Sequence, residues 1–283
     1  MLRPLAGVVL VALFAVTAAA EDAVEIKLAA PKAGARYKVI KTEKTVVSEE
    51  YEIGGKKTGK DREETRRIEY TEEVLVPGAA GGEKPMRAVR VYEKYETKGG
   101  KGNVVAPLRV PITITKRDGK YAFTSEKPLG DFAQKLDEEF NKPDEPTTKD
   151  FLPGKAVKPG DSWKVDTAKF VKSLGAGKMT VDGTKAAMTG KLLKAYKKDG
   201  KQFGVIELVA EFPLKDLGKD GPPLKRGAIK MTTTADVCID GTDPAENTKG
   251  LLGFDVVVDA QGITVSVKSE GVLTTTKELL PAK

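Results

Sequence analysis

The chain has 283 residues, and its 48 Lys and Arg against 41 Asp and Glu give a formal net charge of +7. It contains no His, which excludes hydrolases with a Ser-His or Cys-His pair and removes the commonest metal ligand. One Cys, Cys238, cannot form an intramolecular disulfide or a Cys-based zinc site. Basic and acidic residues are interspersed and aromatic residues are scattered, so we expect no nucleic-acid binding.

The first twenty residues have the three parts of a secretory signal peptide. Arg3 precedes an apolar run over residues 5–16, and three Ala residues at 18–20 precede the cleavage site. We therefore predict a periplasmic or secreted protein that is cleaved before Glu21. No other segment has the roughly 20 apolar residues of a membrane helix, so we expect no transmembrane segment after cleavage.

The next segment, residues 21–142, is predicted to be a β-rich half that ends in a helix. Asp118-Gly119 lies between two strand-like runs and favours a tight hairpin turn. Apolar residues then recur at helical spacing over residues 129–140, with Asp131 available as the N-cap and Pro143 after the end. One amphipathic helix is therefore expected to cover a sheet.

Residues 143–160 are rich in proline and are predicted to be a linker between two β-rich halves, 21–142 and 161–283. The linker prolines are Pro143, Pro146, Pro153 and Pro159. The pattern G-x-x-aromatic-K-V opens each half, at residues 34–39 and 160–165. A pattern this short fits either a duplication or chance, and both remain open.

The second half is predicted to contain a short helix after Asp166 that stops at Gly175, and then several strands. Alternation of apolar and polar residues indicates antiparallel strands with one solvated face. These strands cover residues 205–212, 229–239 and a run from 263, with tight turns at 198–201 and 259–262.

Residues 153–163, PGKAVKPGDSW, resemble the P-x-x-x-V-x-x-G-D-x-W stretch of exported bacterial β-rich families of unknown function. The resemblance implies an exported, mostly β protein and carries over no activity and no site residues. Physically, Pro-Gly-Asp supplies a turn and Trp163 begins a strand by burying its ring, which we favour over a ligand-stacking role.

Motifs for nucleophilic or nucleotide chemistry are incomplete. No Ser lies in S-x-x-K or G-x-S-x-G. Residues 175–180 resemble the end of a phosphate loop, but Lys172 and Met179 stand where Gly and Ser or Thr belong. Cys238 lies on the same side of its predicted strand as Lys230 and Asp236, which predicts some exposure. We nevertheless favour its interpretation as a small packing residue.

The carboxylates allow two further kinds of site, a glycosidase site and a calcium site. A pair across a cleft could hydrolyse glycosides without His, and acidic clusters occur on strand-like segments and on the predicted helix. The clusters are Glu49 and Glu50, Glu63 and Glu64, Glu72 and Glu73, and Asp137, Glu138 and Glu139. Cross-strand ion pairing with Arg62, Arg66 and Arg67 explains the strand doublets more simply.

A calcium site is the second possibility, because hard oxygen ligands gather around a turn. These ligands are Asp236, Asp240, Asp243 and Glu246. Their spacing differs from an EF-hand, and an Asp-Gly turn after a strand explains them without a metal.

Together these features predict a mainly β fold, a large twisted antiparallel sheet that forms an open or half barrel or two similar halves, with one helix packed on it. We expect a non-catalytic binding or scaffold protein of the cell envelope, with no catalytic, cofactor-binding or metal residues and no cofactor. Its ligand would be an apolar small molecule inside the sheet or an anionic envelope polymer at basic loops. The alternative is a carboxylate-dependent glycoside hydrolase that acts on an envelope or extracellular polysaccharide. The basic loop residues are Lys56, Lys57 and Lys60, Lys98 and Lys101, and Lys197, Lys198 and Lys201.

Overall fold

The computed structural model describes residues 22–78, 83–99, 105–142, 146–175, 179–218, 221–260 and 263–281. The predicted signal peptide lies outside the described residues, as do Lys101, Pro143, the middle of the phosphate-loop-like segment (176–178) and turn residues 261–262.

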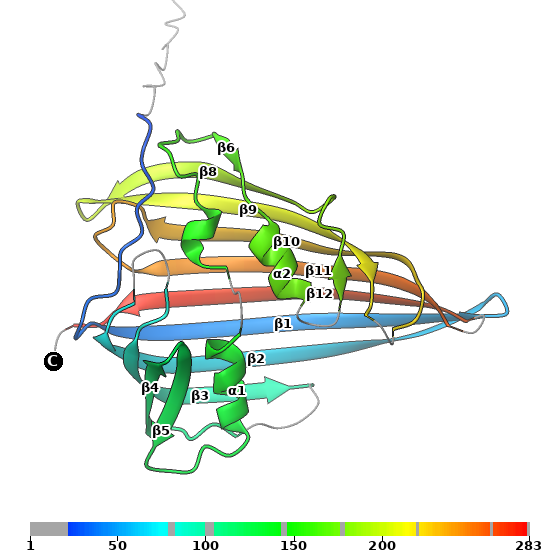
Figure 1. Cartoon of the computed structure of the whole chain (residues 1–283), viewed down its shortest axis with the longest axis horizontal. Coiled ribbons are helices and arrows are strands. Elements are labelled where there is room, and N and C mark those ends of the chain that lie inside the picture. The colour runs from blue at the N-terminus through cyan, green and yellow to red at the C-terminus, as the bar shows by residue number, and fades with distance from the viewer. Residues whose placement is uncertain are drawn as a thin grey trace, which may run out of the picture.

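The described strands form one antiparallel sheet that does not close into a barrel (Figure 1). Its hydrogen-bonded order is β5-β4-β3-β2-β1-β12-β11-β10-β9-β8-β6, and β7 pairs with β9. The first five strands are β1 (Arg36–Ile53), β2 (Lys56–Val76), β3 (Arg87–Lys98), β4 (Pro111–Arg117) and β5 (Lys120–Ser125). The others are β6 (Ser162–Lys164), β7 (Thr180–Val181), β8 (Ala187–Lys198), β9 (Lys201–Asp216), β10 (Leu224–Cys238), β11 (Glu246–Ala260) and β12 (Ile263–Leu279). The helical elements are α1 (Phe132–Phe140), α2 (Ala168–Gly175) and the 3-10 helix η1 (Thr148–Phe151). The predicted mainly β fold class is confirmed.

The centre of the sheet is the pairing of β1 with β12, the first and last strands. Their register runs from Tyr37 opposite Leu279 to Glu52 opposite Thr264. This pairing joins the segments 21–142 and 161–283 through backbone hydrogen bonds. The division into two similar halves stays a prediction.

Both α-helices and η1 lie against the same face of the sheet, which we call the inner face (Figure 1). In β9, Ile206 and Leu208 point to this face while Glu207 and Val209 point to the opposite, outer face, as the period-two pattern predicts. Val209 is 46% exposed and Ile206 is buried, so the helices cover only one side.

The two Asp-Gly turns have the predicted backbone geometry. Asp118 and Gly119 have φ values of 49° and 81°, and Asp199 and Gly200 have 51° and 75°. Positive φ at both central residues is the conformation of a tight hairpin, and each pair connects two adjacent strands.

Helix α1 starts three residues later than predicted. Asp131 is at its N-cap position but makes no side-chain capping bond. The helix buries Phe132, Leu136 and Phe140, which are spaced four residues apart on one face. Phe132 packs edge-on against Tyr92 with ring centroids 5.0 Å apart. Phe140 packs against Tyr121 of β5, with ring centroids 5.2 Å apart. Burying each of these side chains contributes about 1.5–3 kcal/mol, so they anchor α1 on β3 and β5.

The PGDSW segment (159–163) connects the linker residues before it to strand β8. Asp161 accepts a hydrogen bond from the Lys158 backbone N–H (2.8 Å), which closes the turn. The buried Trp163 ring packs against Gly190 of β8, where any Cβ would clash with the indole. Its Nε1–H donates to the Phe151 carbonyl (2.8 Å), so it also fixes η1. The core role predicted for Trp163 is confirmed.

Residues 22–32 cross one end of the sheet as an extended segment (Figure 1). Val24 and Val157 form an antiparallel bridge, and Lys27 bridges to Asp240. Ile26 is buried in the second-half core. This crossing brings the segment close to the inner face, where it forms part of the cavity described below.

Candidate functional site

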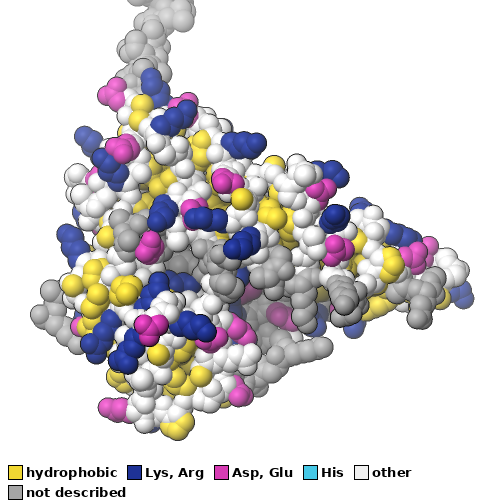
Figure 2. Space-filling model, in the orientation of Figure 1, with side chains coloured by type: hydrophobic (Ala, Val, Ile, Leu, Met, Phe, Trp, Pro, Cys, Tyr) yellow, Lys and Arg dark blue, Asp and Glu magenta, His cyan; other side chains and the backbone are white. Residues whose placement is uncertain are grey.

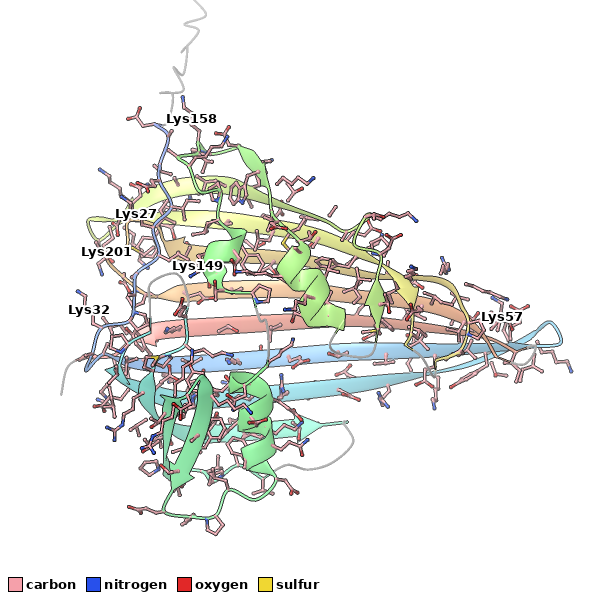
Figure 3. All side chains as sticks on the ribbon, in the orientation of Figure 1. Lys27, Lys32, Lys57, Lys149, Lys158 and Lys201 are labelled. Carbon is pink, nitrogen blue, oxygen red and sulfur yellow. The ribbon has the colours of Figure 1, made fainter. Side chains whose placement is uncertain are left out.

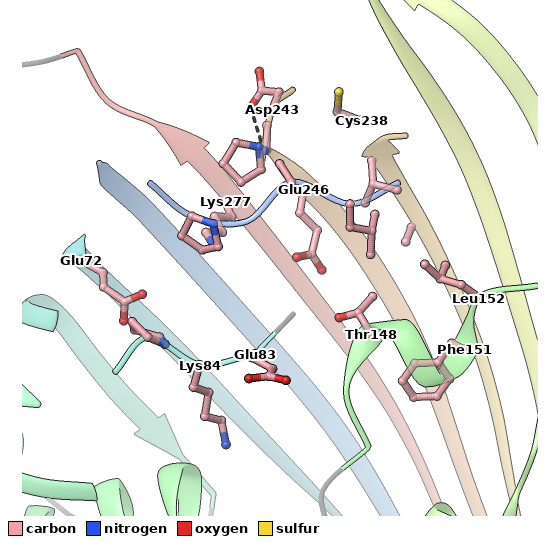
Figure 4. Close-up of a pocket in the computed structure, with 18 of the residues that line it drawn as sticks. Glu72, Glu83, Lys84, Thr148, Phe151, Leu152, Cys238, Asp243, Glu246 and Lys277 are labelled. Carbon is pink, nitrogen blue, oxygen red and sulfur yellow. Dashed lines mark hydrogen bonds between the residues drawn. The ribbon is translucent and has the colours of Figure 1, made fainter. Parts of the chain in front are cut away.

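A cavity of about 280 Å³ lies on the inner face between two hydrophobic clusters. The first cluster surrounds α1 on β1–β5, and the second surrounds Trp163 on β8–β11. The cavity is lined by residues from the N-terminal segment, β2, β3, α1, η1, β9, β10, β11 and β12. Segments that are distant in sequence therefore meet at one place (Figure 4).

One wall of the cavity is apolar. Inward residues of β9 and β10 form it because alternate side chains point to the same face. They are Ile206, Leu208, Ala235 and Val237. Phe151 of η1, the following residue Leu152, and Leu28 of the N-terminal segment extend this wall. It offers contact area to an apolar ligand.

The opposite wall is built around a buried ion pair. Arg90 of β3 has a side chain only 5% exposed and donates to the Glu72 carboxylate through Nε (3.0 Å) and Nη2 (2.7 Å). Its Nη1 donates to the Tyr92 hydroxyl (2.9 Å) and to Glu139 of α1 (3.1 Å). The guanidinium also lies 4.0 Å from the ring centroid of Tyr70. Each guanidinium nitrogen of Arg90 thus has a hydrogen-bond partner within this chain.

The electrostatics of this wall favour the ionised form of Glu139 and the neutral forms of Tyr70 and Tyr92. Burial acts to raise the pKa of Glu139, but the positive charges of Arg90 and Lys41 outweigh it and lower the pKa to about 2. Burial raises the pKa of Tyr92 to about 12 and also raises the pKa of Tyr70. At neutral pH, Glu139 is a carboxylate and both tyrosines are neutral, so Glu139 is not poised as a proton donor.

Asp243, Glu246 and Lys277 form a third, charged part of the cavity lining. Asp243 pairs with Lys201 (2.7 Å), and this partner lowers the Asp243 pKa although burial opposes the change. Glu246 and Lys277 are directly opposite in the register of β11 and β12. The Lys277 ammonium lies over the Tyr37 ring, 4.4 Å from its centroid.

The four carboxylates considered for calcium do not converge. Asp236 points to the outer face and accepts a hydrogen bond from Tyr196 (2.8 Å), whereas Glu246 lines the cavity on the inner face. Asp240 accepts bonds from Thr242 and from the Gln202 backbone N–H (2.7 Å). Hydrogen bonding, chiefly from Thr242, lowers the Asp240 pKa. The described residues contain no group of three or more His, Cys, Asp or Glu side chains that could hold a metal ion.

The acidic doublets on β1 and β2 point to opposite faces and form separate ion pairs. Glu63 pairs with Lys44 across the strands (2.9 Å), whereas Glu64 pairs with Arg62 (2.9 Å). Arg66 reaches Glu43 on the neighbouring strand (2.6 Å). These charges are thus ion-paired, but the expected cross-strand pairing is confirmed only for Arg66, because Arg62 pairs with Glu64 and Arg67 with Glu69 on their own strand. Of the strand doublets, the Glu72–Glu73 pair is the one that reaches the 280 Å³ cavity, through Glu72.

Cys238 is only 1% exposed, so the exposure predicted from its parity is wrong. The loop after β10 covers this side chain, and Cys238 Sγ contacts Asp240 (3.1 Å) and Thr242 (3.5 Å) in it. Its interpretation as a small packing residue is consistent with this burial.

Sequence reasoning named Glu72 and Glu139 only as members of acidic clusters and did not place them at one site with their partner Arg90. Arg90 was not singled out, although one signal was present. Ala88, Arg90 and Tyr92 alternate with Val89 and Val91, so the arginine has the parity of buried neighbours. A charged residue on the buried side of a strand indicates that it has a buried partner of opposite charge.

No family model matches the chain, and no curated protein matches it in sequence. Within the described ranges, no helix is both long and apolar enough to cross a membrane.

Proposed function

We propose that the protein is an exported, non-catalytic binding protein that holds one small ligand in the cavity between its two hydrophobic clusters. The observation that carries this proposal is the pairing of an apolar wall with a fixed polar wall around one half-open cavity. Small-molecule sites combine these features, and their volumes usually start near 300 Å³. At about 280 Å³ the cavity suits a small ligand and not a whole phospholipid.

The volume also sets the size of the ligand. Liquid water takes about 30 Å³ per molecule, so the cavity corresponds to roughly nine waters, or a ligand of about ten non-hydrogen atoms. Such a ligand would contact Leu208 and Phe151 with its apolar part.

The alternative, a glycoside hydrolase, has less support. Such an enzyme needs a carboxylic acid that stays protonated until it donates its proton. Glu139 has a lowered pKa, and both hydrogen bonds that Arg90 makes to Glu72 tie that second carboxylate in place. The cavity carboxylates of this wall therefore serve as partners of Arg90.

Binding of an anionic envelope polymer at the basic loops also has less support. Lys57 is at the tip of the β1–β2 hairpin, while Lys201 is at the other end of the sheet, so the loops do not form one patch (Figure 3). Lys57 pairs with Glu50 (2.8 Å) and Lys60 with Glu49 (3.3 Å). Basic and acidic side chains are interspersed over the face seen in Figure 2. Such a surface gives little net attraction for a polyanion.

Native mass spectrometry of protein purified from its own cell envelope tests the binding proposal. We expect a retained small molecule in the unaltered protein and in Val209→Trp, whose new ring lies on the outer face. Leu208→Trp, one residue earlier, fills the cavity and should abolish retention. Equal retention by both variants, or no retained molecule in any of the three, would contradict the proposal.

Export is tested on the same material. An intact mass that corresponds to residues 21–283 is expected from an envelope fraction. A full-length product in the cytosol would contradict the export part of the proposal.

A further inference from the structure

Four of the five carboxylates that line the cavity have a basic partner. The pairs are Glu72 with Arg90 (2.7 Å), Glu83 with Lys149 (3.2 Å), Glu139 with Arg90 (3.1 Å) and Asp243 with Lys201 (2.7 Å). Among the described residues, Glu246 is the exception, since it makes no ion pair and accepts a hydrogen bond from the Thr248 hydroxyl (2.5 Å). Among the described residues, the Glu246 carboxylate is therefore stabilised by a neutral hydroxyl donor and by no cation.

The cations that line the cavity are already engaged. Arg90 is held by two carboxylates, and Lys84 donates to the backbone carbonyl of Glu139. Lys277, the register partner of Glu246, places its ammonium over the Tyr37 ring. Lys277 is thus the one neighbour on the opposite strand that could compete for Glu246.

Glu246 lies where the polar and apolar walls meet. Its register partner on the other side is Val237, a buried residue of the apolar wall. In Figure 4 its carboxylate points into the cavity, toward the side where Thr148 and Glu83 lie. A ligand on the apolar wall would therefore reach this carboxylate with one end.

We propose that the ligand is a hydrophobic organic ammonium ion of about ten non-hydrogen atoms, whose cationic end pairs with Glu246 and whose apolar body packs against Leu208 and Phe151. This inference rests on the proposed binding function and names the class of ligand. Electrostatics supplies the selectivity, because a carboxylate beside an apolar surface is stabilised by a cation and repels an anion. The Phe151 ring, which also lines the cavity, would favour a cation over a neutral group.

The test is a calorimetric titration of the purified protein, stripped of bound small molecules, with three eight-carbon probes at pH 7. Octylammonium is expected to bind about 10- to 100-fold more tightly than octanol, because a charge-assisted hydrogen bond replaces a neutral one. Octanoate is expected to bind more weakly than octanol. Equal affinities, or a preference for octanoate, would overturn the assignment of an ammonium ligand while leaving the binding function intact. No binding of any probe would count against both.

Two variants locate the selectivity, and a third is the control. Glu246→Gln should reduce the preference for octylammonium over octanol to about twofold or less, with octanol affinity unchanged. Lys277→Gln removes the competing cation and should strengthen octylammonium binding several-fold. Glu211→Gln removes a carboxylate from the outer face, where it pairs with Lys230, and should leave all affinities unchanged. If Glu246→Gln retained the full preference, or if Glu211→Gln lost it, Glu246 would not be the ammonium site.

Discussion

Replacing Arg90 by Met tests the buried ion pair most directly. The Arg90 side chain is 5% exposed and the Glu72 side chain 10%, so the substitution leaves a buried carboxylate without its two hydrogen-bond donors. Removing one partner of a buried ion pair costs about 3–5 kcal/mol. Typical domains have only about 5–15 kcal/mol of total stability, so a large part of the stability would be lost.

The matched control is Arg66→Met. Arg66 lies 2.6 Å from Glu43, but these side chains are 45% and 38% exposed. Because solvent screens exposed pairs, we expect a loss of at most about 1 kcal/mol. The double variant Arg90→Met with Glu72→Gln removes the stranded charge and should recover part of the lost stability.

Urea denaturation followed by far-ultraviolet circular dichroism measures these differences, provided the slope with denaturant stays constant. A loss below about 1 kcal/mol for Arg90→Met would refute the reasoning. So would a double variant no more stable than the single one, because the cost would then not come from the unpaired Glu72.

Three further outcomes are expected. The folded-state pKa of Glu139 is about 2, below its ordinary 4.5, so its contribution to stability is complete above about pH 4.5 and is lost as the pH falls toward 2. Because the side chain is 35% exposed, we expect this contribution to be about 1–2 kcal/mol. The stability of Glu139→Gln, measured over the same pH range, should lack this acid-dependent loss. Gly190→Ala forces a Cβ into the Trp163 ring and should cost about 1–3 kcal/mol in the same urea assay, and an unchanged midpoint would show that the ring can move away. Cys238 should resist a thiol reagent in the native protein and react fully in urea, whereas rapid native labelling would contradict its burial.

The sequence alone was sufficient for the elements whose signal is local. Alternation predicted which side of β9 is buried, and Asp-Gly predicted two hairpin turns, because neighbouring residues fix both features. The helix was found from its apolar spacing, although its first turn was placed too early and Asp131 does not cap it through its side chain. The exposure of Cys238 was mispredicted because a loop beyond the strand covers it.

The cavity depends on contacts that no local pattern encodes. Its lining runs from Leu28 to Lys277, because the N-terminal segment bridges to Val157 and Asp240 and β1 pairs with β12. Arg90 contacts Glu139, which is 49 residues away in the chain. The Lys277 ammonium lies over the Tyr37 ring and does not pair with Glu246. Local side-chain chemistry thus determined the strands and turns, whereas the tertiary structure decided which charges are paired and where an apolar space remains, since both depend on distances between segments far apart in the chain.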